Sequence, residues 1–474
     1  MSFTYSLALI LAVLKGIIIQ CDGGAATSSN RMQASPTIDI KVDEPFLPND
    51  LIEEIVSKTD FKTIQRAVRW GIVPANYIVM NGIIQDRIIV FRPKFTDGIY
   101  EDYQLDDSFL IFGNYQILKL FLDKFGHQVK KIQIDLVECS DIRGKEIIQK
   151  NIKTYAKNLE ELRIYTSNDE RYWKEMSSGE NDIIFPEVKK FQITGDSRRN
   201  ELKLNSIFPK LESFKLFGSV ADVNCLANVK GLKELTLFTS SIEEQKLDDI
   251  FANNENLMKI SLKCPNRTET MHSIAKYLMK LKTLEVGYPG ENFLLRANNS
   301  AVVYELASVT HFYISFHKMD EVFGSEMFSF DMPNLKKLTL KGTGQTDGRI
   351  INFIKYFKDL RIVELLTYEC YAVECIEKLE NIKEFTISSF EMHFNSLKNM
   401  FERFDKKSKL QTLKFIHFDE TLYQTYENTM KEINIHLKKS KKPTWKLSQG
   451  KEIDTHQNYL MLRREPCTCK SCKK

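Results

Sequence analysis

Three cysteines near the C-terminus come closer to a chemical motif than any other residues of this 474-residue chain. Cys467, Cys469 and Cys472 form a C-x-C-x-x-C pattern, and thiolates at such short steps are ligands that zinc accepts. A structural zinc ion takes four ligands, however, and the nearest upstream histidine is His456. A tail with free or mutually oxidised thiols explains the pattern better, so we expect no metal site.

The rest of the sequence contains no known catalytic motif. The eight histidines are scattered, and no cysteine has a histidine close to it in the sequence. The phosphate-binding pattern G-x-x-x-x-G-K-[ST], the metalloprotease pattern H-E-x-x-H and the nucleophile pattern G-x-S-x-G do not occur. We therefore expect a protein that is not an enzyme and that needs no cofactor.

Composition limits the kinds of partner. Lys and Arg total 67 against 63 Asp and Glu, and a net charge of +4 gives no long-range attraction for nucleic acid. The chain is 43% hydrophobic, with 20 Gly and 12 Pro, which favours a large folded core over a disordered or fibrous chain. Five further cysteines suit small buried apolar residues better than a disulfide framework. They are Cys139, Cys225, Cys264, Cys370 and Cys375.

The N-terminus begins with an apolar stretch, Leu7–Ile19. It is too short to cross a bilayer, but it has the length of a signal-peptide core, and Cys21–Ala26 offers small residues for cleavage. No positive charge precedes it, and Met32 offers an alternative start. We assign 1–26 to a leader-like segment and 27–44 to a linker, and leave secretion open.

One apolar unit, L-x-x-L-x-L with Ile, Val or Phe allowed, dominates the chain. Its alternation predicts a short strand with inward and exposed residues. Apolar residues at three- and four-residue steps between copies predict helices, as at 350–356 and 394–404. One unit cannot bury its own apolar side, so neighbours must stack into a curved parallel sheet with helices outside. Twelve copies, 21 to 30 residues apart, begin at Val129, Leu159, Val188, Leu211, Leu232, Leu257, Leu281, Val309, Leu335, Leu360, Ile382 and Leu410.

This unit resembles the leucine-rich repeat, whose period is 20 to 29 residues. The resemblance covers residues 126–420 and implies an α/β solenoid, with a curved parallel sheet and helices on its convex side. The Asn or Cys that many such repeats carry after the strand is not regularly present, since Gly218, Thr239 and Thr367 occur there. That departure indicates an irregular, helix-rich class of repeat.

Two segments flank the predicted repeats. Residues 86–125 form a connecting segment. We expect a strand at Ile83–Phe91, which runs into this segment, then an acidic loop at Tyr100–Ser108 and a helix at Phe109–Phe125. Residues 421–474 form a final helix that shields the open end, followed by a basic, Cys-containing tail. One face of that helix is apolar and consists of Leu422, Tyr426, Met430, Ile433 and Leu437.

Residues 45–85 resemble an F-box, a small helical module. The match lies in L-P-N-D-L-I-E-E-I-V-S, from Leu47 to Ser57, while Thr59 stands where Leu is usual and the later V-C-x-x-W is not recognisable. In the family, this module docks the adaptor of a cullin–RING ubiquitin ligase, and the repeats behind it select a protein substrate. The residues that match the adaptor-docking positions are Leu47, Pro48, Leu51, Ile52 and Ile55.

The resemblance places the partner on the concave side of the sheet, where exposed aromatic and Arg side chains serve as anchors. It implies a cytoplasmic or nuclear chain that binds an adaptor and a protein substrate, binds neither nucleic acid nor membrane, and is monomeric by itself. The alternative is a secreted leucine-rich-repeat binding protein, favoured by the leader and by sequons at Asn266 and Asn298. The predicted concave residues are Arg163, Tyr165, Lys215, Phe217, Thr236, Phe238, Tyr313 and Lys341.

Overall fold

Each of the twelve copies of the repeated unit forms a strand in the computed structural model, and the chain divides into two compact units, Met1–Arg163 and Ile164–Lys474. The leader, the linker and the F-box-like module lie outside the described residues, and with them its five docking positions, Leu47, Pro48, Leu51, Ile52 and Ile55. The structure describes residues 88–92, 103–105, 109–112, 118–119, 121–123, 126–136, 152–166, 184–194, 203–218, 224–238, 244–263, 269–287, 303–318, 330–343, 348–367, 381–388, 409–416, 423–440, 442–451 and 458–465.

The first unit contains β1 (Ile88–Phe91), β2 (Tyr103–Leu105), β3 (Phe109–Phe112), the 3-10 turn η2 (Gly126–Gln128), β4 (Lys131–Leu136), α7 (Lys153–Tyr155) and the start of β5 (Glu161–Thr166). Strand β1 runs parallel to both β3 and β4, and β2 is antiparallel to β3. The predicted loop is wrong where β2 forms, and the predicted helix is wrong where β3 forms. An unbroken apolar run suits a buried strand as well as a helix, and pairing with β1 decides for the strand.

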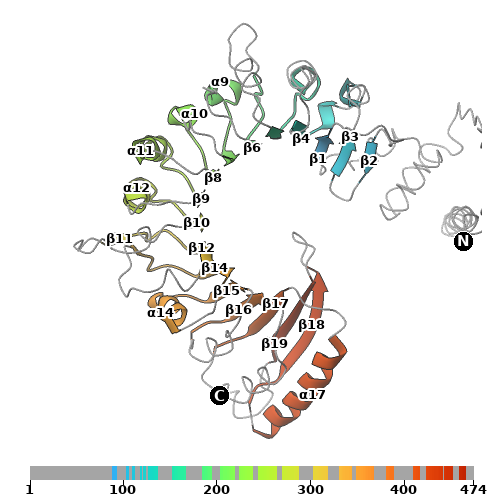
Figure 1. Cartoon of the computed structure of the whole chain (residues 1–474), viewed down its shortest axis with the longest axis vertical. Coiled ribbons are helices and arrows are strands. Elements are labelled where there is room, and N and C mark those ends of the chain that lie inside the picture. The colour runs from blue at the N-terminus through green and yellow to red at the C-terminus, as the bar shows by residue number, and fades with distance from the viewer. Residues whose placement is uncertain are drawn as a thin grey trace, which may run out of the picture. The chain divides into compact units, whose positions relative to one another are not determined.

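The second unit is built on ten strands that pair parallel in chain order, with β11 and β13 pairing separately with each other. Figure 1 shows these ten strands along the inner side and the helices on the outer side, as the repeat pattern predicts. The strands are β6 (Lys190–Thr194), β7 (Ser213–Phe217), β8 (Glu234–Phe238), β9 (Lys259–Lys263), β10 (Thr283–Gly287), β12 (His311–Lys318), β14 (Lys337–Thr343), β15 (Ile362–Thr367), β16 (Glu384–Ser388) and β17 (Thr412–Ile416), with β11 (Tyr304–Glu305) and β13 (Phe330–Asp331). The helices are α9 (Leu204–Ile207), α10 (Asn224–Ala227), α11 (Glu244–Asn253), α12 (Glu269–Tyr277) and α14 (Gly348–Tyr356).

The apolar residues of the repeated unit form continuous ladders under this sheet. Leu338, for example, is the register partner of Phe312 on β12 and of Val363 on β15. All three apolar positions of all twelve copies are buried, and the most exposed, Phe415, is only 6% exposed. Hydrophobic burial is the main term that stabilises a fold. The need to bury these apolar residues therefore explains both their period in the sequence and the stacking of the strands.

Backbone and asparagine hydrogen bonds link each repeat to its neighbour. The carbonyl of Lys189 accepts the N–H groups of Glu212 and Ser213, at 2.8 and 2.9 Å, and the same double acceptance recurs along the sheet. Asn334 donates to the carbonyl of Ala307 in the preceding repeat, at 2.8 Å. Asn334 lies before β14 and so adds a side-chain link to the backbone links between these two repeats.

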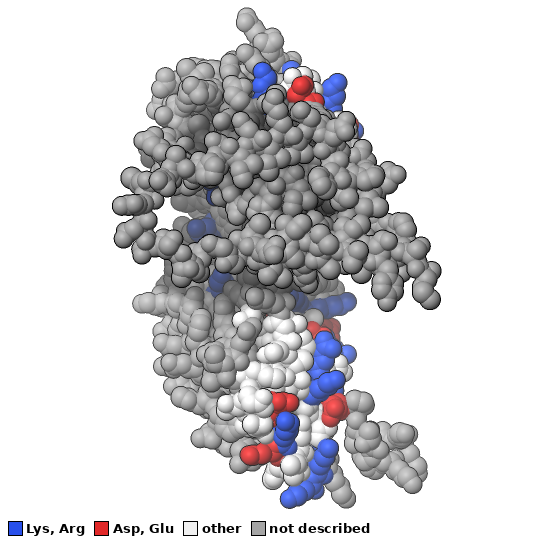
Figure 2. All heavy atoms as spheres, turned by 90° about the vertical axis from the view of Figure 1, so that its right-hand side faces the viewer, with Lys and Arg blue, Asp and Glu red and all other residues white. Residues whose placement is uncertain are grey.

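The C-terminal end of the sheet is closed by α17 (Tyr423–Lys439) and by a hairpin of β18 (Trp445–Lys451) and β19 (Asn458–Arg464). The helix confirms the predicted apolar face, since Met430, Ile433 and Leu437 are buried. The hairpin lies where the sequence pattern predicted only a tail, and β19 pairs antiparallel with β17. On the side shown in Figure 2, the described surface has Lys and Arg beside Asp and Glu, without a region of one sign.

Candidate functional site

In the second unit, the side of the sheet that faces away from the buried ladders is a regular array, which we call the strand face; some of its small side chains, such as Ser261 and Thr339, are themselves buried. It comprises three columns of side chains, because every second residue of each strand points away from the two buried ladders that the apolar residues within the strands form. The first column precedes the first of these ladders: Lys190, Ser213, Glu234, Lys259, Thr283, His311, Lys337, Ile362, Glu384 and Thr412. The middle column lies between the two ladders: Gln192, Lys215, Thr236, Ser261, Glu285, Tyr313, Thr339, Glu364, Thr386 and Lys414. The third column follows the second ladder: Thr194, Phe217, Phe238, Lys263, Gly287, Ser315, Lys341, Leu366, Ser388 and Ile416.

Six of the eight predicted partner-binding residues lie on this face. Lys215, Thr236 and Tyr313 are in its middle column, and Phe217, Phe238 and Lys341 are in its third column. Thr236 is only 8% exposed, so it offers a partner little surface. Of the remaining two residues, both on β5, Arg163 is the last residue of the first unit and Tyr165 belongs to the second.

Two neighbouring phenylalanines of the third column, Phe217 and Phe238, contact each other; we call this pair the aromatic step. The ring centroids of Phe217 and Phe238 lie 4.9 Å apart at an interplanar angle of 49°, and both side chains are partly exposed. The ammonium group of Lys263 lies 6.0 Å from the centre of the Phe238 ring. The next residue of the third column, Gly287, has no side chain, so the aromatic and lysine side chains end there. The sequence analysis did not include Lys263 among the partner-binding residues. The repeat pattern could have identified it, because Lys263 follows Leu262 as Phe238 follows Leu237.

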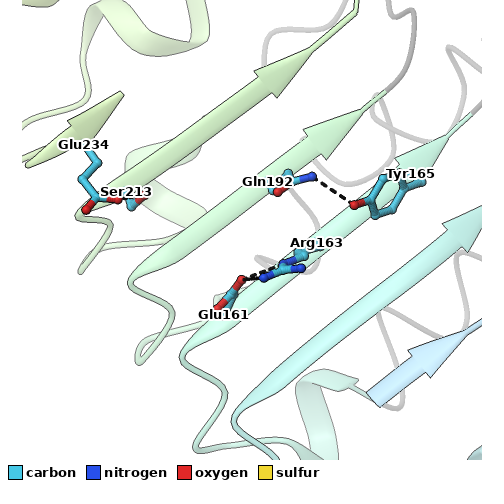
Figure 3. A network of polar contacts seen from close by, with 6 residues as sticks. All are labelled: Glu161, Arg163, Tyr165, Gln192, Ser213 and Glu234. Carbon is cyan, nitrogen blue, oxygen red and sulfur yellow. Dashed lines mark hydrogen bonds and ion pairs between the residues drawn. The ribbon is translucent and has the colours of Figure 1, made fainter. Parts of the chain in front are cut away.

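Polar contacts hold other side chains of the array in place (Figure 3). Within the second unit, Gln192 donates to the hydroxyl of Tyr165 at 3.1 Å, and Ser213 donates to Glu234 at 3.1 Å. In the first unit, the guanidinium of Arg163 bonds Glu161 of the same strand at 2.6 Å. These bonds fix the side chains before a partner arrives, which lowers the entropy cost of binding.

Two ion pairs neutralise part of the strand face. Lys259 contacts Glu285 at 2.6 Å, and Lys337 contacts Glu364 at 2.8 Å. Each pair joins neighbouring strands and is partly exposed, so it contributes little to stability. Lys215 and Lys341 are exposed and have no carboxylate partner among the described residues.

His311 lies beside the second of these pairs, on β12. Its pKa is lowered, first by partial burial and then by the charges of Lys337 and Lys336, while Glu364 acts in the opposite direction. Its Nδ1 atom lies 2.9 Å from the hydroxyl of Thr310. The ring is therefore neutral near pH 7, and the positive charge here comes from lysines.

The described residues give no geometry for a metal site, since nowhere among them do three His, Cys, Asp or Glu side chains gather in a ligating group. The C-terminal cysteines Cys467, Cys469 and Cys472 lie outside these residues. In the same part of the chain, no helix has the length and apolar character to cross a membrane. What the described surface offers is the rigid array of the strand face.

Comparison with known proteins finds chains of similar structure among solved structures. No family model matches the chain, and no curated protein matches it. A crystal structure described as a TLR13–ssRNA13 complex aligns with 60% of this chain and 42% of its own, at 14% identity and a TM-score of 0.35. The chain thus spans less than half of that structure's length. The solenoid architecture rests on the strand register and the buried ladders described above.

Proposed function

We propose that this chain is a protein-binding scaffold whose partner docks on the strand face of the second unit. The observation that carries the proposal is the partly exposed pair of Phe217 and Phe238 beside Lys263, on β7 and β8 of a stacked parallel sheet. Aromatic side chains, Phe among them, are enriched in the cores of protein interfaces. Stacked repeats present such side chains on an extended rigid surface.

We further propose that the scaffold is the substrate receptor of a cullin–RING ubiquitin ligase. Support comes from the sequence alone: an F-box-like segment from Leu47 to Ser57 precedes the repeats. In this arrangement Leu47, Pro48, Leu51, Ile52 and Ile55 insert apolar side chains into a groove of the adaptor. The chain then works in the cytoplasm or nucleus and carries no ubiquitin-transfer chemistry itself.

Co-purification from animal cells tests both levels of the proposal. A C-terminally tagged full-length chain is purified beside two variants, Leu51→Asp and the double variant Phe217→Ala/Phe238→Ala, and the bound proteins are identified by mass spectrometry. We expect Leu51→Asp to lose the adaptor and keep the substrate, and the double variant to do the reverse. Each variant is the control for the other. An adaptor retained by Leu51→Asp contradicts the ligase role, and a substrate retained by the double variant contradicts the strand-face site.

A secreted binding protein is the second candidate. It is favoured by the apolar stretch Leu7–Ile19 and by the sequons at Asn266 and Asn298, all of which lie outside the described residues. N-terminal sequencing of any chain found in the culture medium decides the matter. Cleavage within Cys21–Ala26, together with absence of the adaptor, supports secretion, whereas an intact intracellular chain contradicts it.

A further inference from the structure

At the N-terminal ends of its strands, the second unit has a further surface, which adjoins the strand face and shares residues such as Lys259 and Lys337 with it. Before most of these strands a turn is closed by a backbone hydrogen bond, as from Leu211 N to Phe208 O at 3.2 Å. We define the turn edge as the described residues from three before to two after the first apolar residue of each repeat, from β6 to β17. The parallel register brings these stretches together in one row.

The turn edge is strongly basic. It holds fourteen Lys or Arg residues against six Asp or Glu, which leaves eight net positive charges, whereas the whole chain has a net charge of +4. The basic residues are Lys189, Lys190, Lys210, Lys230, Lys233, Lys259, Lys280, Lys282, Lys336, Lys337, Lys358, Arg361, Lys383 and Lys409. The acidic residues are Glu187, Glu212, Glu234, Glu255, Asp359 and Glu384. The charge of this protein is therefore concentrated at one edge of its sheet.

Local ion pairs neutralise only part of this charge. Lys210 pairs with Glu187 at 2.7 Å, and Lys233 pairs with Glu212 at 2.8 Å. Two further lysines of the edge, Lys259 and Lys337, pair with carboxylates outside it, as given above for the strand face. Seven of the lysines are exposed, and their side chains have no partner among the described residues. They are Lys189, Lys190, Lys230, Lys282, Lys336, Lys358 and Lys383.

Apolar side chains are exposed in the same place. Of the five large hydrophobic side chains that are exposed among the described residues, four lie on or directly before the turn edge. Met258 and Met279, on consecutive repeats, are 46% and 74% exposed, and Ile184 and Tyr356 directly precede stretches of the edge. Flexible Met side chains suit binding surfaces that adapt to a partner. The edge thus combines positive charge with apolar contact area.

We propose that the turn edge binds an extended acidic segment of a protein, in which apolar side chains lie between the carboxylates. This inference rests on the proposed scaffold function and names the chemistry of a second contact with the partner. Three of the unpartnered lysines, Lys282, Lys336 and Lys383, directly follow the first apolar residue of alternate repeats and form a row. Lys230 belongs to the alternate repeat before them but lies two residues before its first apolar residue, Leu232. Alternate strands lie roughly 10 Å apart, which about three residues of extended chain also span. A carboxylate at every third position of the segment matches this row.

A polypeptide fits the turn edge better than a single-stranded nucleic acid does. Nucleic-acid grooves add several aromatic side chains on which successive bases stack, whereas Tyr356 is the one aromatic side chain exposed on or directly before the described stretches of the edge. Thirteen of the fourteen basic residues are lysines, which lack the planar fork that binds phosphate in two places. Met258 and Met279 instead offer contacts to aliphatic side chains.

Fluorescence anisotropy with three labelled probes tests the inference on the full chain at low salt. Two are peptides of equal length and charge, with Glu at every third position and either Leu or Ser between; the third is oligo-uridylate of equal charge. We expect the Glu/Leu peptide to bind most tightly. The triple variant Lys230→Glu/Lys282→Glu/Lys336→Glu should weaken it at least about tenfold, because each lost contact becomes a repulsion. Met258→Ser/Met279→Ser should remove the preference for Leu over Ser.

Matched variants separate the turn edge from general charge and apolar effects. Lys203→Glu/Lys355→Glu/Lys446→Glu changes three exposed lysines outside the edge, and Ile435→Ser changes an exposed apolar residue of α17. Both should leave binding unchanged, and circular dichroism should show every variant folded. Tighter binding of oligo-uridylate, no binding of the Glu/Leu peptide, or an equal loss in the control triple variant overturns the inference. The scaffold proposal is untouched by these outcomes, because it depends on the Phe217→Ala/Phe238→Ala result.

Discussion

Phe217 and Phe238 are register partners on β7 and β8, and their rings lie 4.9 Å apart across the two strands. The N–H of Gly218, directly after Phe217, donates to the carbonyl of Phe238 at 2.9 Å, so the backbones are also joined where the rings meet. Because both the rings and the backbones are in contact, the pair is a rigid anchor. A partner that covers it loses little entropy in ordering these side chains. Because the rings are partly exposed, they cost the free chain some unfavourable contact with water.

Truncating this pair should weaken partner binding with little loss of stability. Each Phe→Ala change at an interface anchor is expected to cost about 2 kcal/mol of binding free energy, roughly thirtyfold in Kd. Isothermal titration calorimetry of the double variant with the co-purified substrate measures this. Ile435→Ala, an exposed apolar change on α17, is the matched control. An unchanged Kd for the double variant would place recognition elsewhere.

The buried ladders should be far more sensitive to truncation than the strand face. Leu338 is fully buried and Lys341, on the same strand, is exposed. We expect Leu338→Ala to lower the free energy of unfolding by about 2 to 5 kcal/mol, and Lys341→Ala to change it by less than about 0.5 kcal/mol. Urea unfolding followed by circular dichroism compares them. Equal losses would contradict the assignment of the two sides of the sheet.

Asn254 should be the most costly polar side chain to remove among those described here. It is 2% exposed, accepts from the N–H of Leu232 at 2.9 Å, and donates to the carbonyls of Val229 and Ile250 at 2.7 and 2.9 Å. Asn254→Ala leaves these backbone groups unsatisfied, so we expect a loss of about 2 to 4 kcal/mol in unfolding free energy. Asn256→Ala is the control, because Asn256 is exposed and accepts from Lys280. Similar unfolding midpoints for both variants would rule this role out.

The strands and their buried side chains followed from the sequence because one physical rule governs both. A strand with one buried side needs apolar residues two positions apart. The last three positions of L-x-x-L-x-L have this spacing in every repeat, so they predict the strand and its buried residues. The same alternation of buried and outward-facing residues predicts that Phe217, Phe238 and Tyr313 lie on the strand face. No such rule existed for Phe109–Phe112, whose unbroken apolar run suits either a strand or a helix.

What could not be predicted depends on tertiary contacts. The hairpin after α17 forms because Leu460 and Leu462 of β19 lie opposite Phe415 and Leu413 of β17, a pairing between distant residues. Asn434 adds a contact of the same kind, since its side chain bonds both the N–H and the carbonyl of Trp445, at 2.9 and 2.8 Å. The exposure of Met258 and Met279 likewise depends on which turns stack.

Acidification should destabilise the second unit partly through His311. Its pKa is lowered in the folded state, by burial first and by Lys337 and Lys336 next, so the unfolded chain binds the proton more tightly. The neutral ring's contribution is therefore fully present above the unfolded pKa, near 6.5, and is lost as the pH falls through the lower folded pKa. Urea midpoints measured at about pH 7.5 and about pH 5.5 should differ less in His311→Gln than in the unchanged chain. An identical pH dependence in both would exclude a role for His311.

Removing the C-terminal hairpin should convert the end of the sheet into a site of self-association. Strand β17 has β16 on one side and β19 on the other, so a chain that ends after Lys439 exposes its backbone N–H and C=O groups. Exposed edge strands pair with other chains, and Leu413 and Phe415 would lose part of their cover. We expect concentration-dependent dimers or larger species by size-exclusion chromatography with light scattering. The full-length variant Asn434→Ala, which loses only the two bonds to Trp445, should stay closer to monomeric. A truncated chain that remains monomeric at high concentration would show that α17 alone protects the edge.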